Sequence, residues 1–477
     1  MAELKRVLGF WTILSLAISS IMGTGLFFGA AIGSSHSGNA SILAWVILTV
    51  VALYISMYFS ELSSMYPRAG GVYEFSKHAY NRFFSFIMGW IAWIVGNLST
   101  ALLVVAAINY LIPDPAQFWL KIVVSVIFIL VLNLIAFFGV EFGAFLLVVF
   151  AFIAVSVLLS VIIPGTFKMD FDNYFPFFTF GISSIFVTMF FMIESFFGWE
   201  SATYLAEETK EPEKVIPKAI ILGTIIVGVL GIAVTAVSLG VIPWKILALS
   251  DAPLSVVSEQ TIGGIGVKFL NIGIFAALIG SAAGGIFTMP RLILALARDK
   301  LFIAQFSQVH ERFKTPHKAI LFQTIASLLI FAMAFGNYED LLSLLLPLGL
   351  IMYFFVILSV PILRNKEPAA KRSFKVPFAR IGSLLVALFI VLVVSSWLFS
   401  TPGAINTLKL GISLIFVGVP IYLLLQIYYD PDAIIKMNDS LAYFSLLTEK
   451  IVLPKIIRKE VLALLGDMKG KRILEFG

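Results

Sequence analysis

The apolar stretch 182–206 is interrupted in its middle by the sequence ESFFGWE (Glu194–Glu200). The stretch has the length of a membrane-spanning helix, yet it has two carboxylates and a glycine at mid-depth. A charged side chain at the centre of a bilayer costs roughly 2.5–3.5 kcal/mol on insertion scales. Irregular backbone at that depth is tolerated only where protein or a water-filled cavity receives its polar groups. The interruption therefore predicts half of a binding site.

The composition places this stretch in a polytopic membrane protein. Of 477 residues, 60% are hydrophobic and 13% charged, whereas soluble proteins average about 25% charged residues. There is no cysteine, which excludes a thiol nucleophile, disulfides and cysteine metal sites. The four histidines have no ligand spacing, so no metal site is predicted. The net charge of +6 does not indicate nucleic-acid binding. The sequence shows no pairing of a nucleophile with a base, so an enzyme is not predicted.

Twelve apolar spans are expected to cross the lipid bilayer. Lysine and arginine fix the orientation, because 20 of 33 fall in loops and helix ends on the side of the N-terminus, 5 on the other side and 8 in the C-terminal tail. The sequence predicts a multi-pass protein of the cell membrane with both termini cytoplasmic. The expected spans are 10–34, 41–66, 83–112, 119–139, 142–163, 182–206, 215–242, 267–297, 319–335, 341–363, 381–400 and 408–428.

A second interruption lies in the first span, at SSIMGTGLFFG (Ser19–Gly29). Gly23 and Gly198 are five spans apart, so the second unit enters the membrane in the opposite orientation. Interrupted helices in corresponding positions of two inverted halves indicate the binding site of a secondary transporter. The alternative is that these glycines only allow close helix packing.

The two interruptions offer opposite polarities. The free amides from Gly23 to Leu26 begin the second half of the first span and favour an anion such as a carboxylate. The carbonyls near Met192 to Ser195 end the first half of the sixth span and can accept from an ammonium. A carboxylate and an ammonium held close together describe an α-amino acid.

Several motifs in a shared order resemble the amino acid–polyamine–organocation (APC) superfamily of transporters. Besides SSIMGTGLFFG, they are ELSSMYPRAGGVYEF (Glu61–Phe75), MGW (Met88–Trp90), FFGWESATYLAEETKEPEKVIPKAI (Phe196–Ile220), TMPRLILALARDKLF (Thr288–Phe302) and LRNKEPAAKRSFKVPF (Leu363–Phe378). The resemblance implies an all-α membrane protein with the LeuT-like fold. That fold has about 12 transmembrane helices, a five-plus-five inverted repeat, and broken first and sixth helices.

The resemblance also implies site residues. Met22, Gly23, Thr24 and Gly25 would bind the substrate carboxylate, and the backbone at Ile193 and Glu194 its ammonium. Phe197 and Trp199, beside Gly198, would line or cover the pocket, although lipid-facing aromatic side chains are an equal alternative in a chain with 45 phenylalanines. Glu200 matches an acidic position of the family, and its alternative is a structural carboxylate.

Glu194 has three open interpretations: a group that recognises a cationic substrate, a protonatable coupling group, or a buried structural acid. Proton-coupled relatives often have a lysine in the fifth helix, and this chain has no lysine or arginine between Lys121 and Lys168. Coupling to H+ is expected, and coupling to Na+ is less favoured. A sodium ion would need first-helix carbonyls with Ser281 or Thr288.

The loop after the sixth span alternates glutamate and lysine, which is typical of a solvated loop. The resemblance adds a cytoplasmic gate, for which Glu208 and Arg68 are the expected partners. No organic cofactor is expected.

The domain organisation follows from these spans. Residues 1–428 are predicted to form the transporter domain, with inverted repeats at about 10–165 and 181–363 and two extra helices at 381–428. Residues 429–477 form a cytoplasmic tail. Its end, GDMKGKRILEFG, resembles the first strand of a Rossmann-like methyltransferase, so a soluble domain that starts here is one expectation and an ordinary short tail the other.

The function implied by the resemblance is amino acid transport by alternating access, as a proton-coupled carrier or an exchanger. Two alternatives stay open: a transporter of polyamines or organocations, and an amino acid sensor of the same fold that does not transport. The sequence does not predict an oligomeric state.

Overall fold

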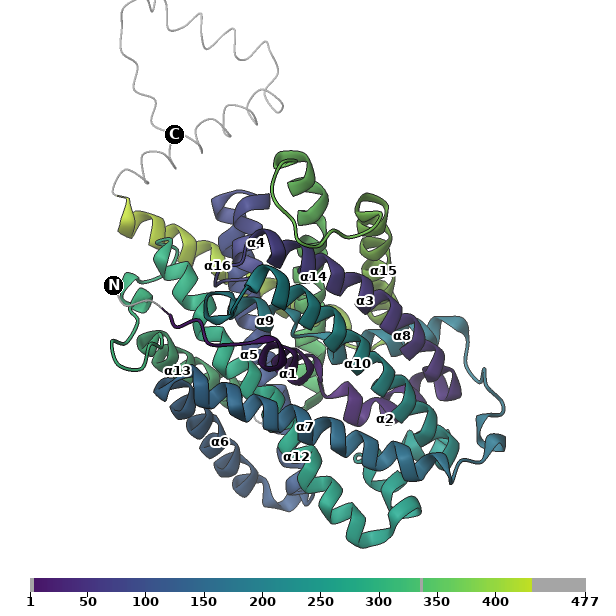
Figure 1. Cartoon of the computed structure of the whole chain (residues 1–477). Coiled ribbons are helices and arrows are strands. Elements are labelled where there is room, and N and C mark those ends of the chain that lie inside the picture. The colour runs from purple at the N-terminus through teal and green to yellow at the C-terminus, as the bar shows by residue number, and fades with distance from the viewer. Residues whose placement is uncertain (1–3, 335–337, 431–477) are drawn as a thin grey trace, which may run out of the picture. The chain divides into compact units, whose positions relative to one another are not determined.

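Helices make up all regular elements among the residues that the computed structural model describes, 4–334 and 338–430 (Figure 1). Internal contacts group residues 1–420 into one unit and 421–477 into another, and the first unit is described here. The predicted tail lies outside the described residues beyond residue 430. The α-helices are α1 (Phe10–Ile21), α2 (Gly25–Ser37), α3 (Ser41–Met65), α4 (Val72–Ala79), α5 (Arg82–Leu111), α6 (Phe118–Phe138), α7 (Val140–Thr166), α8 (Ile182–Met192), α9 (Trp199–Tyr204), α10 (Pro212–Val241), α11 (Trp244–Leu247), α12 (Pro253–Arg298), α13 (His317–Ala334), α14 (Tyr338–Lys366), α15 (Ala379–Ser400) and α16 (Ala404–Tyr429).

Each expected span corresponds to one helix or to one helix broken in two. The first span is α1 followed by α2, and the sixth is α8, a 3₁₀ turn at Ile193–Phe196, and α9. The helical segment α12 starts before the expected eighth span, at Pro253, but it consists of two helices that meet at Gly263, where φ is 80°. The second of these helices begins close to Val267, as expected, and the first is too polar to appear in the apolar pattern.

Ten segments of the described chain are long and apolar enough to cross a membrane. One of them, Phe10–Met65, contains two expected spans, and α13 adds a shorter apolar helix. The outer faces of α6, α7 and α15 expose large apolar side chains: Leu134 is 55% exposed, Phe152 73% and Leu384 68%. Such surfaces are stable only in contact with lipid or another apolar face. The protein is therefore a multi-span membrane protein.

Helices that lie five spans apart in the chain pack against each other. The second span, α3, packs on the seventh, α10, and the third, α5, packs on the eighth, α12. In the first and sixth spans, α2 packs on α8 and α1 packs on α9. Figure 1 shows α1 and α9 close to one another among these longer helices. This is the pairing of the five-plus-five inverted-repeat fold with broken first and sixth helices, and the exact repeat bounds stay a prediction.

Two of the motifs behind the family resemblance meet at one buried carboxylate. Glu61, near the end of α3, is fully buried. Its carboxylate accepts hydrogen bonds from Nε of Arg364 at 2.9 Å and from Nη2 of Arg364 at 2.6 Å. The backbone N–H of Val376 donates to the same carboxylate at 2.7 Å. A bidentate arginine fixes geometry as well as charge. Glu61 therefore fastens the loop after α14 to α3, outside the region where the two helices break.

Candidate functional site

The two helix breaks lie against each other. Helix α1 ends at Ile21 and α2 begins at Gly25, while Gly198 before α9 has φ 120°, a conformation that side-chain-bearing residues rarely adopt. A Cβ at Gly198 would collide with the backbone carbonyl of Ser20. Glycine is thus needed here both for its dihedral angle and for the close approach of the first break to the second.

The amino-terminal end of α2 holds the carboxylate of Glu194. Oε2 of Glu194 accepts from the hydroxyl of Thr24 at 2.9 Å and from the backbone N–H of Gly25 at 3.2 Å. A Cβ on Gly23 would collide with the same carboxylate, and Glu194 is only 1% exposed. The position predicted to receive a substrate carboxylate is therefore an anion site, and in this structure a carboxylate of the chain itself lies in it.

Ser195 lies on the same helix end. Its side chain is fully buried, and a Cβ on Gly25 would collide with its Oγ. No hydrogen-bond partner is found for this hydroxyl in the described part of the chain. The carbonyl oxygen of Met192 is near as well, 3.4 Å from the position of that Cβ. A free donor and a carbonyl acceptor thus flank the anion site on the side of the sixth span.

Aromatic side chains cover the site beside the first turn of α2. The hydroxyl of Tyr338, at the start of α14, lies 2.8 Å from Oγ1 of Thr24. The ring of Phe28 packs between Tyr338 and Tyr110, with centroid distances of 5.3 and 5.1 Å. Thr24 therefore connects the Glu194 carboxylate to an aromatic cover built from α2, α5 and α14.

The second predicted carboxylate, Glu200, is also buried, 5% exposed, and accepts from the hydroxyl of Tyr353 at 2.8 Å. The same hydroxyl accepts from the backbone N–H of Gly198 at 3.2 Å. Tyr353 thus joins the sixth-span break to α14, and Glu200 faces the break rather than a lysine or arginine.

The two predicted aromatic residues of the site are buried rather than lipid-facing. The ring of Phe197 meets Tyr353 edge-on at 5.0 Å, and Trp199 donates through Nε1 to Thr224 of α10 at 2.8 Å. Both are under 5% exposed. Trp199 therefore points toward α10, and Phe197 packs toward α14.

On the side where the chain starts, a buried ion pair joins the sixth span to α12. Arg291 donates to Glu208 through Nε at 2.9 Å and Nη2 at 2.8 Å, and a further nitrogen donates to the carbonyl of Phe287. The side chains are 2% and 0% exposed. The carbonyl of Glu208 also accepts from the N–H groups of Val7 and Leu8. The segment before α1 and the segment after α9 are thereby held together.

This ion pair corrects the sequence prediction. The expected pairing of Glu208 with Arg68 is wrong, because Arg68 is exposed in the turn after α3 while Arg291 projects from α12 at the level of Glu208. The expectation of a solvated loop is likewise wrong for Glu208 and holds for Glu211 and Lys214, which are exposed. Arg68 lines a wide opening of about 800 Å³ together with Glu207 and Arg298.

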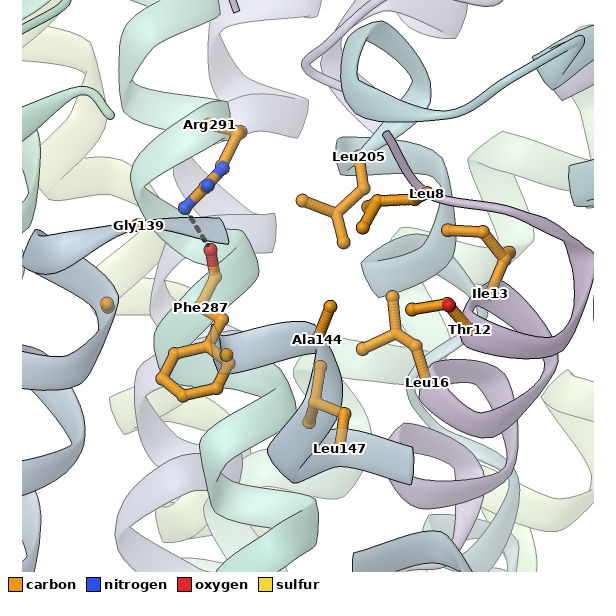
Figure 2. Close-up of a pocket in the computed structure, with 12 residues that line it drawn as sticks. Leu8, Thr12, Ile13, Leu16, Gly139, Ala144, Leu147, Leu205, Phe287 and Arg291 are labelled. Carbon is orange, nitrogen blue, oxygen red and sulfur yellow. Dashed lines mark hydrogen bonds between the residues drawn. The ribbon is translucent and has the colours of Figure 1, made fainter. Parts of the chain in front are cut away.

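A narrow cleft with a volume of about 20 Å³ lies beside the ion pair, and Figure 2 shows Arg291 next to it. Its walls are apolar side chains of α1, α7 and α12, among them Leu16, Leu147 and Phe287 (Figure 2). The cleft runs along the first half of the broken first span. Beside the cleft, the hydroxyl of Ser19 in α1 donates to the carbonyl of Leu147 in α7 at 3.4 Å.

A family model described as "Amino acid permease" matches residues 8–425 of the chain. The chain belongs to the amino acid permease family. The permease is 26% identical over 438 residues to the serine/threonine exchanger SteT of Bacillus subtilis, covering 88% of this chain and 96% of the relative. It is 25% identical to the human cystine/glutamate transporter, covering 94% and 89%, and 25% identical to a methylthioribose transporter of Bacillus subtilis, covering 81% and 87%. It is accordingly a transporter and not an enzyme.

The two predicted hydroxyls of the permease's eighth span differ in their placement. Ser281 donates to the carbonyl of Met22 in the first break at 2.9 Å, whereas Thr288 donates to Gly284 of its own helix at 2.8 Å. Ser281 therefore touches the site and Thr288 does not.

Sequence reasoning missed three polar side chains of the permease's site, Tyr338, Tyr353 and Arg291. A usable signal existed for Arg291, because an ionisable residue inside a membrane span is a site residue by default. Tyr353 also lies in an expected apolar span and Tyr338 just before it, and a buried hydroxyl needs a partner. That partner was not visible, since Thr24 and Glu200 are far away in the sequence.

Proposed function

We propose that this permease is a secondary active transporter that moves amino acids across the plasma membrane by alternating access. The observation that supports this proposal is the carboxylate held on the amino-terminal end of α2, between the breaks of the first and sixth spans. An amino acid would place its carboxylate on Thr24 and Gly25, and its ammonium near the carbonyls of Met192 and Ile193.

The closures on either side of the site fit alternating access. Tyr338 on Thr24 covers one side, and Arg291 on Glu208 closes the other. Opening requires each closure to break in turn while the other holds. The backbone bonds from Val7 and Leu8 to Glu208 would make the first half of the first span and the second half of the sixth move together.

We further propose the proton as the coupling ion, unless the permease works by exchange. Glu194 and Glu200 are the candidate carriers, since both are buried and both contact a helix break. A tenfold proton gradient supplies about 1.4 kcal/mol, enough to drive appreciable accumulation. Sodium stays the less favoured alternative, for which Ser281 is the predicted hydroxyl that contacts a carbonyl of the first break.

The proposed orientation places both termini in the cytoplasm. It is supported by the excess of lysine and arginine in loops on the N-terminal side. The opening lined by Arg68 and the Arg291–Glu208 pair would then face the cell interior.

Reconstitution in proteoliposomes tests the proposed function. Labelled L-serine, L-threonine, L-leucine, L-glutamate and L-cystine would be supplied to vesicles preloaded with the same unlabelled compound, with and without an imposed pH or sodium gradient. Counterflow of at least one amino acid above protein-free vesicles is expected, driven further by an inward proton gradient in the case of symport. Glu194→Gln is measured in parallel, since changed selectivity or proton dependence would assign Glu194 to the site.

A transporter of polyamines or organocations is the second candidate, and the buried anion of Glu194 favours it. Labelled putrescine in the same assay decides between the two, because only an amine carrier would exchange it in preference to amino acids. A sensor of the same fold would bind a panel member without exchanging label, and this result would overturn the transport proposal.

A further inference from the structure

The carboxylate of Glu194 lies where the carboxylate of a transported amino acid is proposed to bind. It accepts from Thr24 at 2.9 Å and from the N–H of Gly25 at 3.2 Å, and it lies against the backbone of Gly23. No ion pair of the described residues includes Glu194. Its charge is thus held by the helix end and a hydroxyl, as a bound anionic ligand would be.

A second observation shows that this position is built for a ligand. Ser195 is fully buried, its hydroxyl has no hydrogen-bond partner among the described residues, and it points at Gly25 of the same helix end. A buried hydroxyl without a partner is unfavourable unless a ligand or water supplies one. The site therefore has one more donor than the Glu194 carboxylate uses.

We propose that Glu194 is a built-in surrogate for the substrate carboxylate, which lets the substrate-free permease return across the membrane. The proposal rests on the proposed function and assigns its mode of transport. In the empty carrier, Glu194 fills the anion position, so the two breaks close around a carboxylate as they do around a substrate. The arriving amino acid displaces Glu194 and takes over Thr24, Gly25 and the free hydroxyl of Ser195.

The displacement follows from charge. Two carboxylates cannot occupy the same helix end, because like charges at contact distance repel. An α-amino acid brings an ammonium one carbon away from its carboxylate, and this ammonium is the nearest cation for the displaced Glu194. The exchange of one carboxylate for another thus leaves the net charge of the occupied site unchanged, and no proton has to be bound or released at Glu194.

The consequence is net transport. If the anion position stayed empty in the absence of substrate, the carrier could not close around the empty site. Such a carrier would move substrate only by exchange. A carrier that supplies its own carboxylate populates the closed empty state and completes the cycle. With Glu194 in this role, Glu200 remains as the proposed proton carrier.

The test compares uptake into vesicles without internal substrate with uptake into preloaded vesicles. The probe is L-serine or, if another panel member gives larger counterflow, that amino acid. For the wild type, we expect the two initial rates to agree within about threefold. For Glu194→Ala, we expect the rate into unloaded vesicles to fall about tenfold or more while exchange in preloaded vesicles persists. Glu141→Ala, an exposed acid at the start of α7, is the matched control and should keep the wild-type ratio.

Acetate provides a chemical rescue. The alanine variant leaves room beside Thr24, so acetate on both sides of the membrane should restore uptake into unloaded vesicles. Acetamide, which has the same shape and no charge, should not restore it, and the wild type should respond to neither. Glu194→Gln keeps the shape without the charge and should lose net uptake without being rescued, which provides a second variant if Glu194→Ala does not fold.

The proposal is overturned if the wild type transports only into preloaded vesicles, or if a folded Glu194→Ala or Glu194→Gln variant keeps the wild-type ratio. Failure of the proposed function looks different. In that case no panel member exchanges in preloaded vesicles even for the wild type, and both proposals are lost.

Discussion

Arg291 and Glu208 form a two-hydrogen-bond ion pair that is closed to solvent, with N–O distances of 2.9 and 2.8 Å. The pair connects α12 to the turn that follows α9 at the end of the broken sixth span. Parallel N–H···O bonds between a guanidinium and a carboxylate fix orientation as well as energy. The pair therefore ties the end of the sixth span to α12.

We expect Arg291→Met to destabilise the permease by about 3–5 kcal/mol, because it leaves the buried Glu208 carboxylate without its partner. The double variant Arg291→Met with Glu208→Leu should recover most of this loss, since both charges are then removed. Thermal unfolding in detergent measures the difference. As a control, Lys214→Met breaks the exposed pair with Glu211 and should cause no measurable change. Equal stability of the Arg291→Met single and double variants would contradict this account.

The approach of Glu194 to Gly23 gives a second prediction. A Cβ at residue 23 collides with the Glu194 carboxylate, so Gly23→Ala should cost about 1–3 kcal/mol of stability through overpacking. Adding Glu194→Ala removes the colliding group and should recover stability. Non-additivity of the two changes in a double-mutant cycle measures the contact.

The matched control for Gly23→Ala is Gly264→Ala in α12. An added Cβ there meets no atom within 4 Å, and alanine favours the helix over glycine by up to about 1 kcal/mol. Gly264→Ala should therefore be neutral or stabilising. If Gly23→Ala were equally harmless, Glu194 would not lie against Gly23 in the folded permease.

Tyr353 supplies the third prediction. Tyr353→Phe removes the hydroxyl that donates to Glu200 and accepts from the N–H of Gly198. Two buried polar groups lose a partner, and each such loss costs about 1–3 kcal/mol. We expect lower thermal stability and slower uptake, whereas Tyr428→Phe, at a side chain 75% exposed, should leave both unchanged. Unchanged stability of Tyr353→Phe would show that Glu200 and Gly198 find other partners.

The positions of the two helix breaks could be predicted from the sequence alone. Gly23 and Gly198 stand inside apolar runs of helical length, so polar backbone at mid-membrane depth was foreseeable at both positions, and the five-span offset predicted that they meet. The structure confirms that α1 and α8 end within a few residues of these glycines.

The partner of each buried charge was not foreseeable. Lysine and arginine counts place Arg68 and Arg291 on the same side of the membrane, but they do not tell which side chain reaches Glu208 at its depth. Glu194 was singled out as unusual, yet its contact with Thr24 joins residues 170 positions apart. Such contacts depend on side-chain direction in the packed bundle, which hydrophobic periodicity does not encode.

The last prediction concerns the orientation of the chain in the membrane. Because the sequence has no cysteine, this orientation can be tested by labelling introduced cysteines. Each introduced cysteine is the single thiol of the chain. Lys214 is exposed at the start of α10, and Lys245 is exposed in α11, just beyond the other end of α10. Each is replaced by cysteine in a separate variant. With both termini cytoplasmic, a membrane-impermeant maleimide should label Lys245→Cys in intact cells and Lys214→Cys only after permeabilisation. The cysteine-free parent gives the background, and Lys168→Cys should behave like Lys245→Cys. The reverse pattern would place the Arg291–Glu208 closure on the outside and invert the direction of the proposed cycle.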